Sequence, residues 1–162
     1  MRNCIGLLLF VAGSIALPKI AGSQDSAERQ QIVFVCEHGA ALSVVSAAYF
    51  NKLAGEQHLN LHAIARGATP QKDIAVSARD GLKGDGVLSE TRQPQSLSQK
   101  DVAHALRVVA FCPLPRKYSR MAPVETWNDV PATGVNYGLA RDAILRHLRE
   151  LIRELKSGDD KR

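Results

Sequence analysis

The chain has 162 residues, of which 45% are hydrophobic and 23% are charged. This length is sufficient for one globular domain with a substantial core and is short for two. The 12 glycines and 7 prolines are close to average usage, which excludes collagen-like and disordered classes, and a net charge of +5 is too modest to indicate a nucleic-acid partner.

Residues 1–23 have the pattern of a secretory signal peptide. A positive charge at Arg2 precedes an apolar run over residues 4–17, and the small residues 21–23 provide a cleavage site. The apolar run is too short to cross a bilayer comfortably, so we do not expect a stable membrane anchor. The sequence predicts an exported protein, periplasmic or secreted, with residues 24–162 as its single mature domain.

The first element of the mature domain is predicted at Ile32–Val35, a continuous apolar run typical of a strand buried on both faces. A short loop follows. Beyond it, Val45, Tyr49 and Leu53 recur every four residues before Gly55, which predicts a helix.

The rest of the chain continues the alternation of strands and helices. We expect strands at 59–65 and 107–111, a short strand at 124–127, and helices near 74–82, after a capping box at 98–101, and along the apolar stripe of 144–155. This alternation predicts an α/β three-layer sandwich with a small parallel sheet of about four strands.

The loop after the first strand is the strongest candidate site. Ligands of open parallel sheets bind beyond the carboxyl ends of the strands, and a glycine-bearing turn into a helix N-terminus presents N–H groups to an anion. Cys36 occupies this position, where the same groups would stabilise a thiolate nucleophile. The alternative is that Cys36 is simply a small buried residue at a strand end.

The segment Ile32–Ser43, which has the sequence IVFVCEHGAALS, resembles the phosphate-binding loop of low-molecular-weight protein tyrosine phosphatases and thioredoxin-coupled arsenate reductases. Their pattern is C-x5-R-S after an apolar strand, and weaker similarities extend over most of the mature chain. The resemblance implies that Cys36 attacks phosphorus and that Ser43 stabilises its thiolate. It also implies that a phosphate-like oxyanion or phosphorylated substrate binds, without metal or cofactor, among Glu37, His38, Gly39, Ala40, Ala41 and Leu42.

The sequence departs from this pattern at Leu42, which occupies the position of the family's arginine. That arginine binds the equatorial oxygens of the phosphoryl group in a bidentate manner, which leucine cannot do. We therefore expect slow phosphatase chemistry, or oxyanion binding without turnover. Arg66, at the end of the second strand, is a candidate to reach over the loop instead; the alternative is an exposed arginine at a strand end.

In the resembled family the general acid is an aspartate immediately before a proline. Here Asp129 lies one residue further from Pro131, with Val130 between them. We take Asp129 as the candidate acid, on the hypothesis that a flexible loop absorbs the shift. An ordinary loop aspartate is the alternative.

Cys112 follows the third predicted strand, which is expected beside the first. Adjacent strands lie about 4.8 Å apart, which is compatible with a disulfide between Cys36 and Cys112. The position also resembles that of the second redox cysteine of the arsenate reductases, although their third cysteine has no counterpart here. A two-cysteine redox protein, a static bridge and a buried thiol all remain open.

Overall fold

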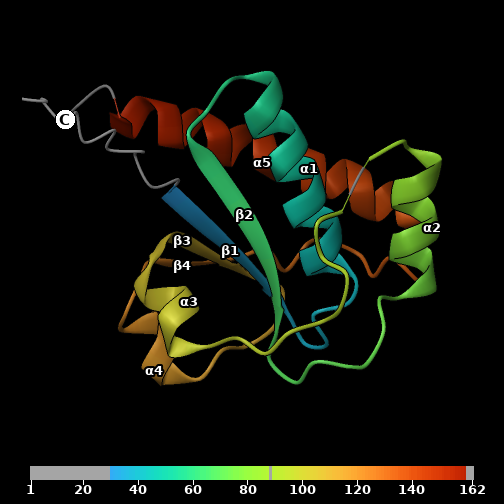
Figure 1. Ribbon diagram of the computed structural model, residues 1–162, viewed down its shortest axis with the longest axis horizontal. Coiled ribbons are helices and arrows are strands. Elements are labelled where there is room, and N and C mark those ends of the chain that lie inside the picture. The colour runs from blue at the N-terminus through green and yellow to red at the C-terminus, as the bar shows by residue number, and fades with distance from the viewer. Residues whose placement is uncertain (1–29, 88, 160–162) are drawn as a thin grey trace, which may run out of the picture.

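The computed structural model describes residues 30–87 and 89–159, so the predicted signal peptide lies outside the described residues. Figure 1 shows the chain arranged in layers, with a sheet between two groups of helices. Within the described ranges, no helix is both long enough and apolar enough to span a membrane.

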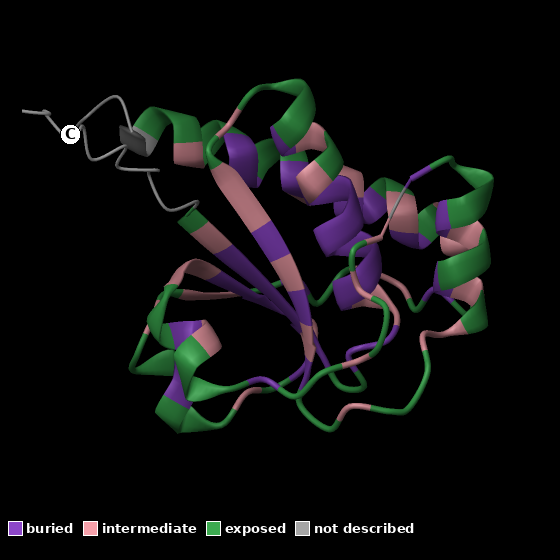
Figure 2. Cartoon of the chain, in the orientation of Figure 1, coloured by how far each residue is buried: buried purple, intermediate pink, exposed green. Residues whose placement is uncertain are grey.

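The sheet has four parallel strands in the order β2-β1-β3-β4. The strands are β1 (Gln30–Cys36), β2 (Leu61–Gly67), β3 (Ala105–Ala110) and β4 (Val124–Thr126). The continuous apolar run places β1 in the interior of the sheet, as predicted, and Ile32–Val35 are fully buried there. Figure 2 shows this strand buried along most of its length.

Helices cover both faces of the sheet, which confirms the predicted three-layer sandwich. One face packs on α1 (Leu42–Glu56), α2 (Val76–Gly84) and α5 (Tyr137–Asp159). The other face packs on the short helices α3 (Gln99–Ala103) and α4 (Arg116–Ser119). Side chains alternate across the sheet, so that β1 contributes Ile32 and Phe34 to the first layer and Val33 and Val35 to the second.

Hydrogen bonds at helix ends explain where the observed elements differ from the predicted ones. α1 continues through Gly55, and the N–H of Leu59 donates to the carbonyl of Ala54 at 2.9 Å. β2 begins two residues further on, at Leu61, which pairs with Gln30 of β1. α4 lies in a stretch expected to be loop, and its single turn is too short to produce a periodic pattern.

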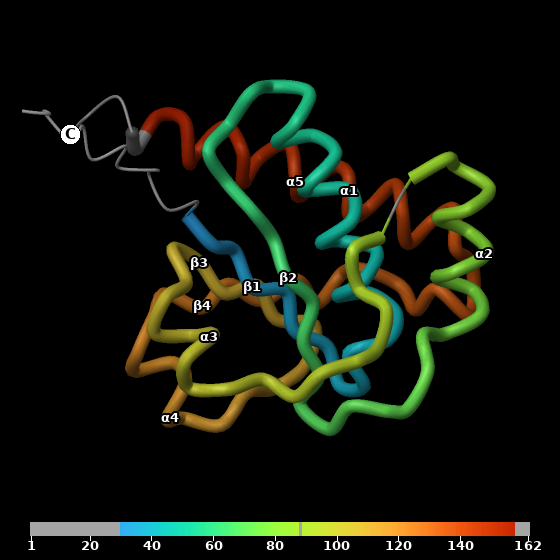
Figure 3. Tube along the Cα trace, in the orientation of Figure 1, coloured from blue at the N-terminus to red at the C-terminus, as the bar shows by residue number. Residues whose placement is uncertain are grey.

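The predicted capping box at α3 is confirmed. The Ser98 hydroxyl accepts a hydrogen bond from the Asp101 N–H at 3.1 Å, and the Asp101 carboxylate accepts one from the Ser98 N–H at 2.9 Å. Figure 3 shows segment 89–98, which leads into α3, crossing beside β2. This segment pairs with the sheet through Gly67, whose N–H donates to the Gln95 carbonyl at 2.8 Å.

A polar cluster joins α2 to its neighbouring helices. The hydroxyls of Tyr49 on α1 and Tyr137 on α5 both donate to Asp85 Oδ2, at 2.5 and 2.9 Å, and Arg141 pairs with Asp85 Oδ1 at 3.2 Å. Burial and the hydrogen bond to Asp85 raise the pKa of Tyr49 to about 12. The Tyr137 ring lies against Gly81, where a Cβ would come within 2.4 Å of ring atoms. These contacts fix α2, whose first turn borders the candidate site.

Candidate active site

Cys36 and Ser43 meet at the carboxyl end of the central strand. Cys36 is the last residue of β1, Ser43 lies in the first turn of α1, and their Sγ and Oγ atoms are 3.1 Å apart. Ser43 is fully buried and Cys36 is 7% exposed. The structure therefore brings together the two residues that the sequence assigned to nucleophile and thiolate stabiliser.

The backbone of the intervening loop is oriented by hydrogen bonds to segment 68–75. The carbonyls of Cys36, Glu37, His38 and Ala40 accept from N–H groups of this segment, at 2.8–3.2 Å. In a trans peptide unit the carbonyl and the next N–H point in opposite directions. The N–H groups of residues 37, 38, 39 and 41 therefore point away from segment 68–75, and none of them donates to a backbone acceptor among the described residues.

The N-terminus of α1 adds to this set of donors. The N-cap residue Ala41 has no side chain to accept hydrogen bonds from the first turn. The first N–H groups of a helix lack partners within it, and the helix dipole makes this end electropositive. Residues 37–43 thus form a turn into a helix with unpaired backbone N–H groups, an arrangement suited to binding an anion.

Two glycines set the position of the loop. Gly39 has a φ of +62°, in the left-handed region that favours glycine. A Cβ at Gly39 would lie 2.7 Å from the backbone nitrogen of Gly67, and a Cβ at Gly67 would lie 2.8 Å from that of Gly39. The loop and the end of β2 therefore pack backbone to backbone.

Cys36 opens onto a cavity of about 390 Å³. Its walls come from the loop, the start of α2 and the segment before α5, and its lining residues are Cys36, Glu37, His38, Ala40, Ala41, Leu42, Gln71, Ala75, Ser77, Phe111, Ala132, Thr133 and Gly134. Among these described residues there is no lysine or arginine. Leu42 lies in the wall, so the cavity is apolar where the resembled family has a cation.

The polar side chains of Glu37 and His38 are held at the rim of the loop. The carboxylate of Glu37 accepts a hydrogen bond from the Thr69 hydroxyl at 2.6 Å, and the His38 ring lies 3.3 Å from the Thr69 carbonyl. Both residues are exposed. Of the predicted anion-binding residues, His38, Gly39 and Ala41 contribute N–H groups oriented away from segment 68–75, and Ala40 contributes to the cavity wall.

Arg66 does not reach the loop, contrary to the expectation from the sequence. The Nε and Nη2 atoms of Arg66 donate to the two carboxylate oxygens of Asp101, each at 3.0 Å. Its Nη1 donates to the carbonyl of the preceding residue, Ala65. Side chains alternate along a strand, and this alternation directs Arg66 toward α3. The capping carboxylate of α3 thus holds the guanidinium that was proposed to compensate for Leu42.

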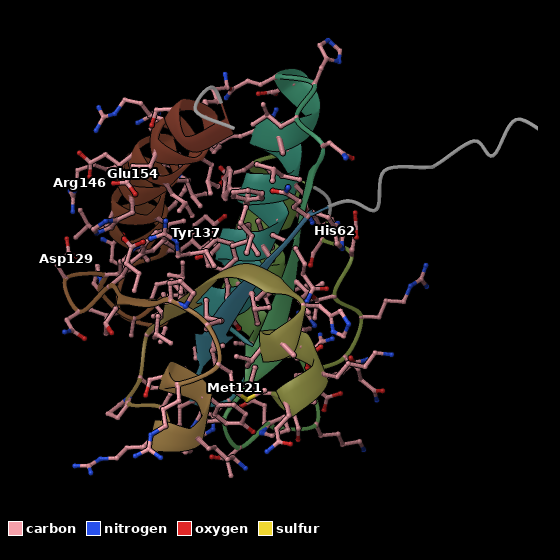
Figure 4. All side chains as sticks on the ribbon, turned by 90° about the vertical axis from the view of Figure 1, so that its left-hand side faces the viewer. His62, Met121, Asp129, Tyr137, Arg146 and Glu154 are labelled. Atoms are coloured by element: carbon pink, nitrogen blue, oxygen red, sulfur yellow. The ribbon has the colours of Figure 1, made fainter. Side chains whose placement is uncertain are left out.

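Asp129 is also placed away from the cavity. Its Oδ1 accepts from His147 Nε2 at 2.7 Å and its Oδ2 accepts from Arg146 Nη2 at 2.6 Å, both on α5. Figure 4 shows Asp129 and Arg146 on the outer side of the molecule. The hydrogen bond from His147, reinforced by the charge of Arg146, lowers the pKa of Asp129. Both its position and its ionisation disagree with the predicted role as general acid.

Cys112 is a free, buried cysteine, as is Cys36. Burial raises the pKa of the Cys112 thiol to about 11, with smaller contributions from the charges of Glu37 and Cys36. Cys112, which follows β3, therefore lies close enough to the loop for the charges of Glu37 and Cys36 to affect its pKa. Cys112 does not line the cavity, in contrast to Cys36.

The sequence did not single out the hydroxyl pair on the opposite cavity wall. Ser77 Oγ and Thr133 Oγ1 are 2.9 Å apart and join α2 to the segment before α5. Thr133 is only 4% exposed. No sequence signal marks this pair, because the two residues are 56 positions apart, one on α2 and one in the segment before α5. Metal-binding groups of three or more His, Cys, Asp or Glu side chains are not found within residues 30–87 and 89–159.

No family model and no curated protein sequence matches the chain. Solved structures do match its fold. An arginine phosphatase, YwlE from Geobacillus stearothermophilus, is 18% identical with a TM-score of 0.66, and the match covers 82% of this chain and 96% of that one. A low-molecular-weight phosphotyrosine phosphatase from Vibrio cholerae is 12% identical with a TM-score of 0.63, over 82% and 98% of the two chains.

An arsenate reductase in its phosphate-binding state is 14% identical, with a TM-score of 0.65 over 77% of this chain and 98% of that one. At these identities the likeness is one of fold. The chain therefore has the fold shared by low-molecular-weight phosphotyrosine phosphatases, arginine phosphatases and arsenate reductases.

Proposed function

We propose that this protein is a slow cysteine-dependent phosphatase of the low-molecular-weight type. The observation that supports this most directly is the position of Cys36 Sγ, 3.1 Å from a buried serine hydroxyl and at the base of a loop with unpaired N–H groups. Cys36 attacks phosphorus, the loop N–H groups bind the phosphoryl oxygens, and Ser43 stabilises the sulfur when it leaves.

Slow turnover follows from the positions of two side chains, Leu42 and Asp129. Leu42 provides no bidentate donor to the phosphoryl oxygens, and by analogy with arginine fingers the loss of such a group costs about 10³ to 10⁵ in rate. Asp129 is held by α5, so it supplies no proton. The remaining stabilisation comes from backbone donors, which still bind an oxyanion.

Hydrolysis of an activated aryl phosphate by residues 24–162, with and without reductant, tests this proposal. We expect phosphate release that disappears in Cys36→Ser and falls in Ser43→Ala, because the alanine no longer stabilises the departing thiolate. Phosphate release that persists in Cys36→Ser would contradict the proposal. A requirement for reductant would indicate that a disulfide with Cys112 forms and blocks the nucleophile.

Leu42 supports a second candidate function, in which the loop binds an oxyanion or a partner without turnover. Leu42→Arg distinguishes the two functions, with Leu42→Lys as a control that carries charge without the bidentate fork. If the arginine raises an existing Cys36-dependent rate by orders of magnitude, the natural protein is a slow enzyme. If only Leu42→Arg turns over, the natural protein is a binding protein on a catalytic scaffold.

A further inference from the structure

We propose that the preferred substrates of this site are acyl phosphates, mixed anhydrides whose leaving group is a carboxylate. This inference rests on the proposed phosphatase function and concerns which phosphoryl donors it accepts. It derives from the positions of two carboxyl groups, those of Asp129 and Glu37, relative to Cys36.

No carboxylic acid among the described lining residues is placed to protonate a leaving group in the cavity. Asp129 receives hydrogen bonds from Arg146 and His147 at 2.6 and 2.7 Å, which keep it ionised and outside the cavity. Glu37 is the only carboxyl among the described lining residues, and the Thr69 hydroxyl holds it at the rim, at 2.6 Å. Ser77 and Thr133 are hydroxyls that hydrogen-bond each other. The His38 ring also lines the cavity, and its Nδ1 lies at the exposed rim, 3.3 Å from the Thr69 carbonyl.

A leaving group that receives no proton departs as an anion, and its stability as an anion then controls the rate. A phenol of the tyrosine type has a pKa of about 10, whereas a carboxylic acid has a pKa of about 4. General acid catalysis contributes about 10² to 10⁴ to the departure of poor leaving groups. A carboxylate needs no such assistance, so a site whose carboxyl groups are held away from the leaving group discriminates in favour of acyl phosphates.

The two chemical steps balance without an added acid. The Cys36 thiolate forms an S–P bond while the P–O bond to the acyl group breaks, and the electron pair leaves with the carboxylate. Water then attacks phosphorus, the S–P bond breaks, and its electron pair returns to Cys36, beside Ser43. One water proton stays on the phosphate and the other is released to solvent.

The walls and mouth of the cavity favour an apolar acyl group. Phe111 and Leu42 line it, and two exposed aliphatic residues are sequence neighbours of lining residues. Val76 is 61% exposed between the lining residues Ala75 and Ser77, and Val135 is 84% exposed next to Gly134. An acyl group with an apolar body would cover this surface while its carboxylate oxygen leaves toward solvent.

The test is the dependence of kcat/KM on leaving-group pKa at pH 7.5, where phosphate monoesters are dianions and carry no spare proton. The series runs from phenyl phosphate through nitro-substituted aryl phosphates to benzoyl and acetyl phosphate, with the Cys36→Ser rate subtracted. We expect a steep negative slope, acyl phosphates at least about 10² faster than phenyl phosphate, and a KM about tenfold lower for benzoyl than for acetyl phosphate.

A flat slope with Cys36-dependent turnover would overturn the inference and leave the phosphatase function standing. Absence of Cys36-dependent turnover with every donor would overturn the phosphatase function itself. Glu37→Gln provides the matched control for the remaining carboxyl. We expect it to change all rates by a similar factor, and selective slowing of phenyl phosphate would identify Glu37 as an acid and contradict the inference.

Discussion

At the scale of single residues, the loop depends on two glycines that touch. Gly39 and Gly67 approach so closely that a Cβ on either one would lie within 2.8 Å of the other's backbone. This contact holds the loop against the end of β2, and with it the direction of the loop N–H groups. The sequence places a glycine at both positions but does not show that they meet.

Gly67→Ala is expected to displace the loop and to lower Cys36-dependent hydrolysis by about 10²-fold, the typical cost of a misplacement of about 1 Å. Gly55→Ala is the matched control, because a Cβ at Gly55 meets nothing within 4 Å. Steady-state kinetics of both variants measures the difference. Equal activity of Gly67→Ala and Gly55→Ala would show that the loop does not need this contact.

The two cysteines should differ in reactivity. With a pKa of about 11, Cys112 is present as thiolate to only about one part in ten thousand at pH 7. We expect iodoacetamide to modify Cys36, which lines the cavity, and to leave Cys112 unmodified in the folded protein, as measured by peptide mass spectrometry. Prior unfolding should expose both. Equal labelling of both cysteines in the native protein would contradict this placement.

Residue patterns predicted that Cys36 and Ser43 lie together, but not where the other candidate residues lie. Cys36 and Ser43 meet because a tight turn joins a strand to a helix and leaves little conformational freedom between them. Nothing near Arg66 or Asp129 in the sequence determines its partner. Arg66 binds Asp101, and Asp129 binds Arg146 and His147 of α5; all of these partners are distant in sequence.

At the scale of elements, α3 is tied to the sheet by the same carboxylate that caps it. Asp101 accepts hydrogen bonds from Ser98 and from Arg66 of β2. Burial opposes its ionisation, but the hydrogen bonds from Arg66 and Ser98 outweigh burial and lower its pKa. A carboxylate with a depressed pKa in the folded state stabilises the protein above its unfolded-state pKa and loses that contribution in acid.

Asp101→Asn is therefore expected to lower the free energy of unfolding at pH 7 by about 1–3 kcal/mol. The difference from the parent should shrink below about pH 4, where the parent's carboxylate also becomes protonated. Urea unfolding at pH 7 and pH 3 measures this. Asp80→Asn is the control, because Asp80 pairs with Arg79 on the surface, where such pairs contribute little. A pH-independent difference for Asp101→Asn would contradict the assignment.

Long periodic elements were predictable, and the short elements α3 and β4 were also predicted, α3 from its capping box. Helix α4 was not predicted. The apolar run of β1 and the stripe of α5 are unambiguous because they reflect burial over many residues. The single turn of α4 is too short to produce a periodic pattern.

At the scale of the whole molecule, the topology places the candidate loop, residues 37–41, at the carboxyl end of the interior strand β1. The alternation of strands and helices indicated a parallel sheet, and the structure orders its strands β2-β1-β3-β4. The cavity was less accessible to prediction, because its wall combines the loop with Ser77 of α2 and Thr133 before α5. Only the assembled layers bring these segments together.

A phosphorylated Cys36 is the intermediate on which the proposed chemistry depends. Rapid mixing of the reduced protein with benzoyl phosphate, an acid quench and peptide mass spectrometry would detect it. We predict that the peptide containing Cys36 gains one phosphoryl group, that this species accumulates further in Ser43→Ala, and that Cys36→Ser hydrolyses no substrate. Phosphate release by the parent with no phosphoryl group on Cys36 at any time would contradict the assignment of Cys36 as the nucleophile.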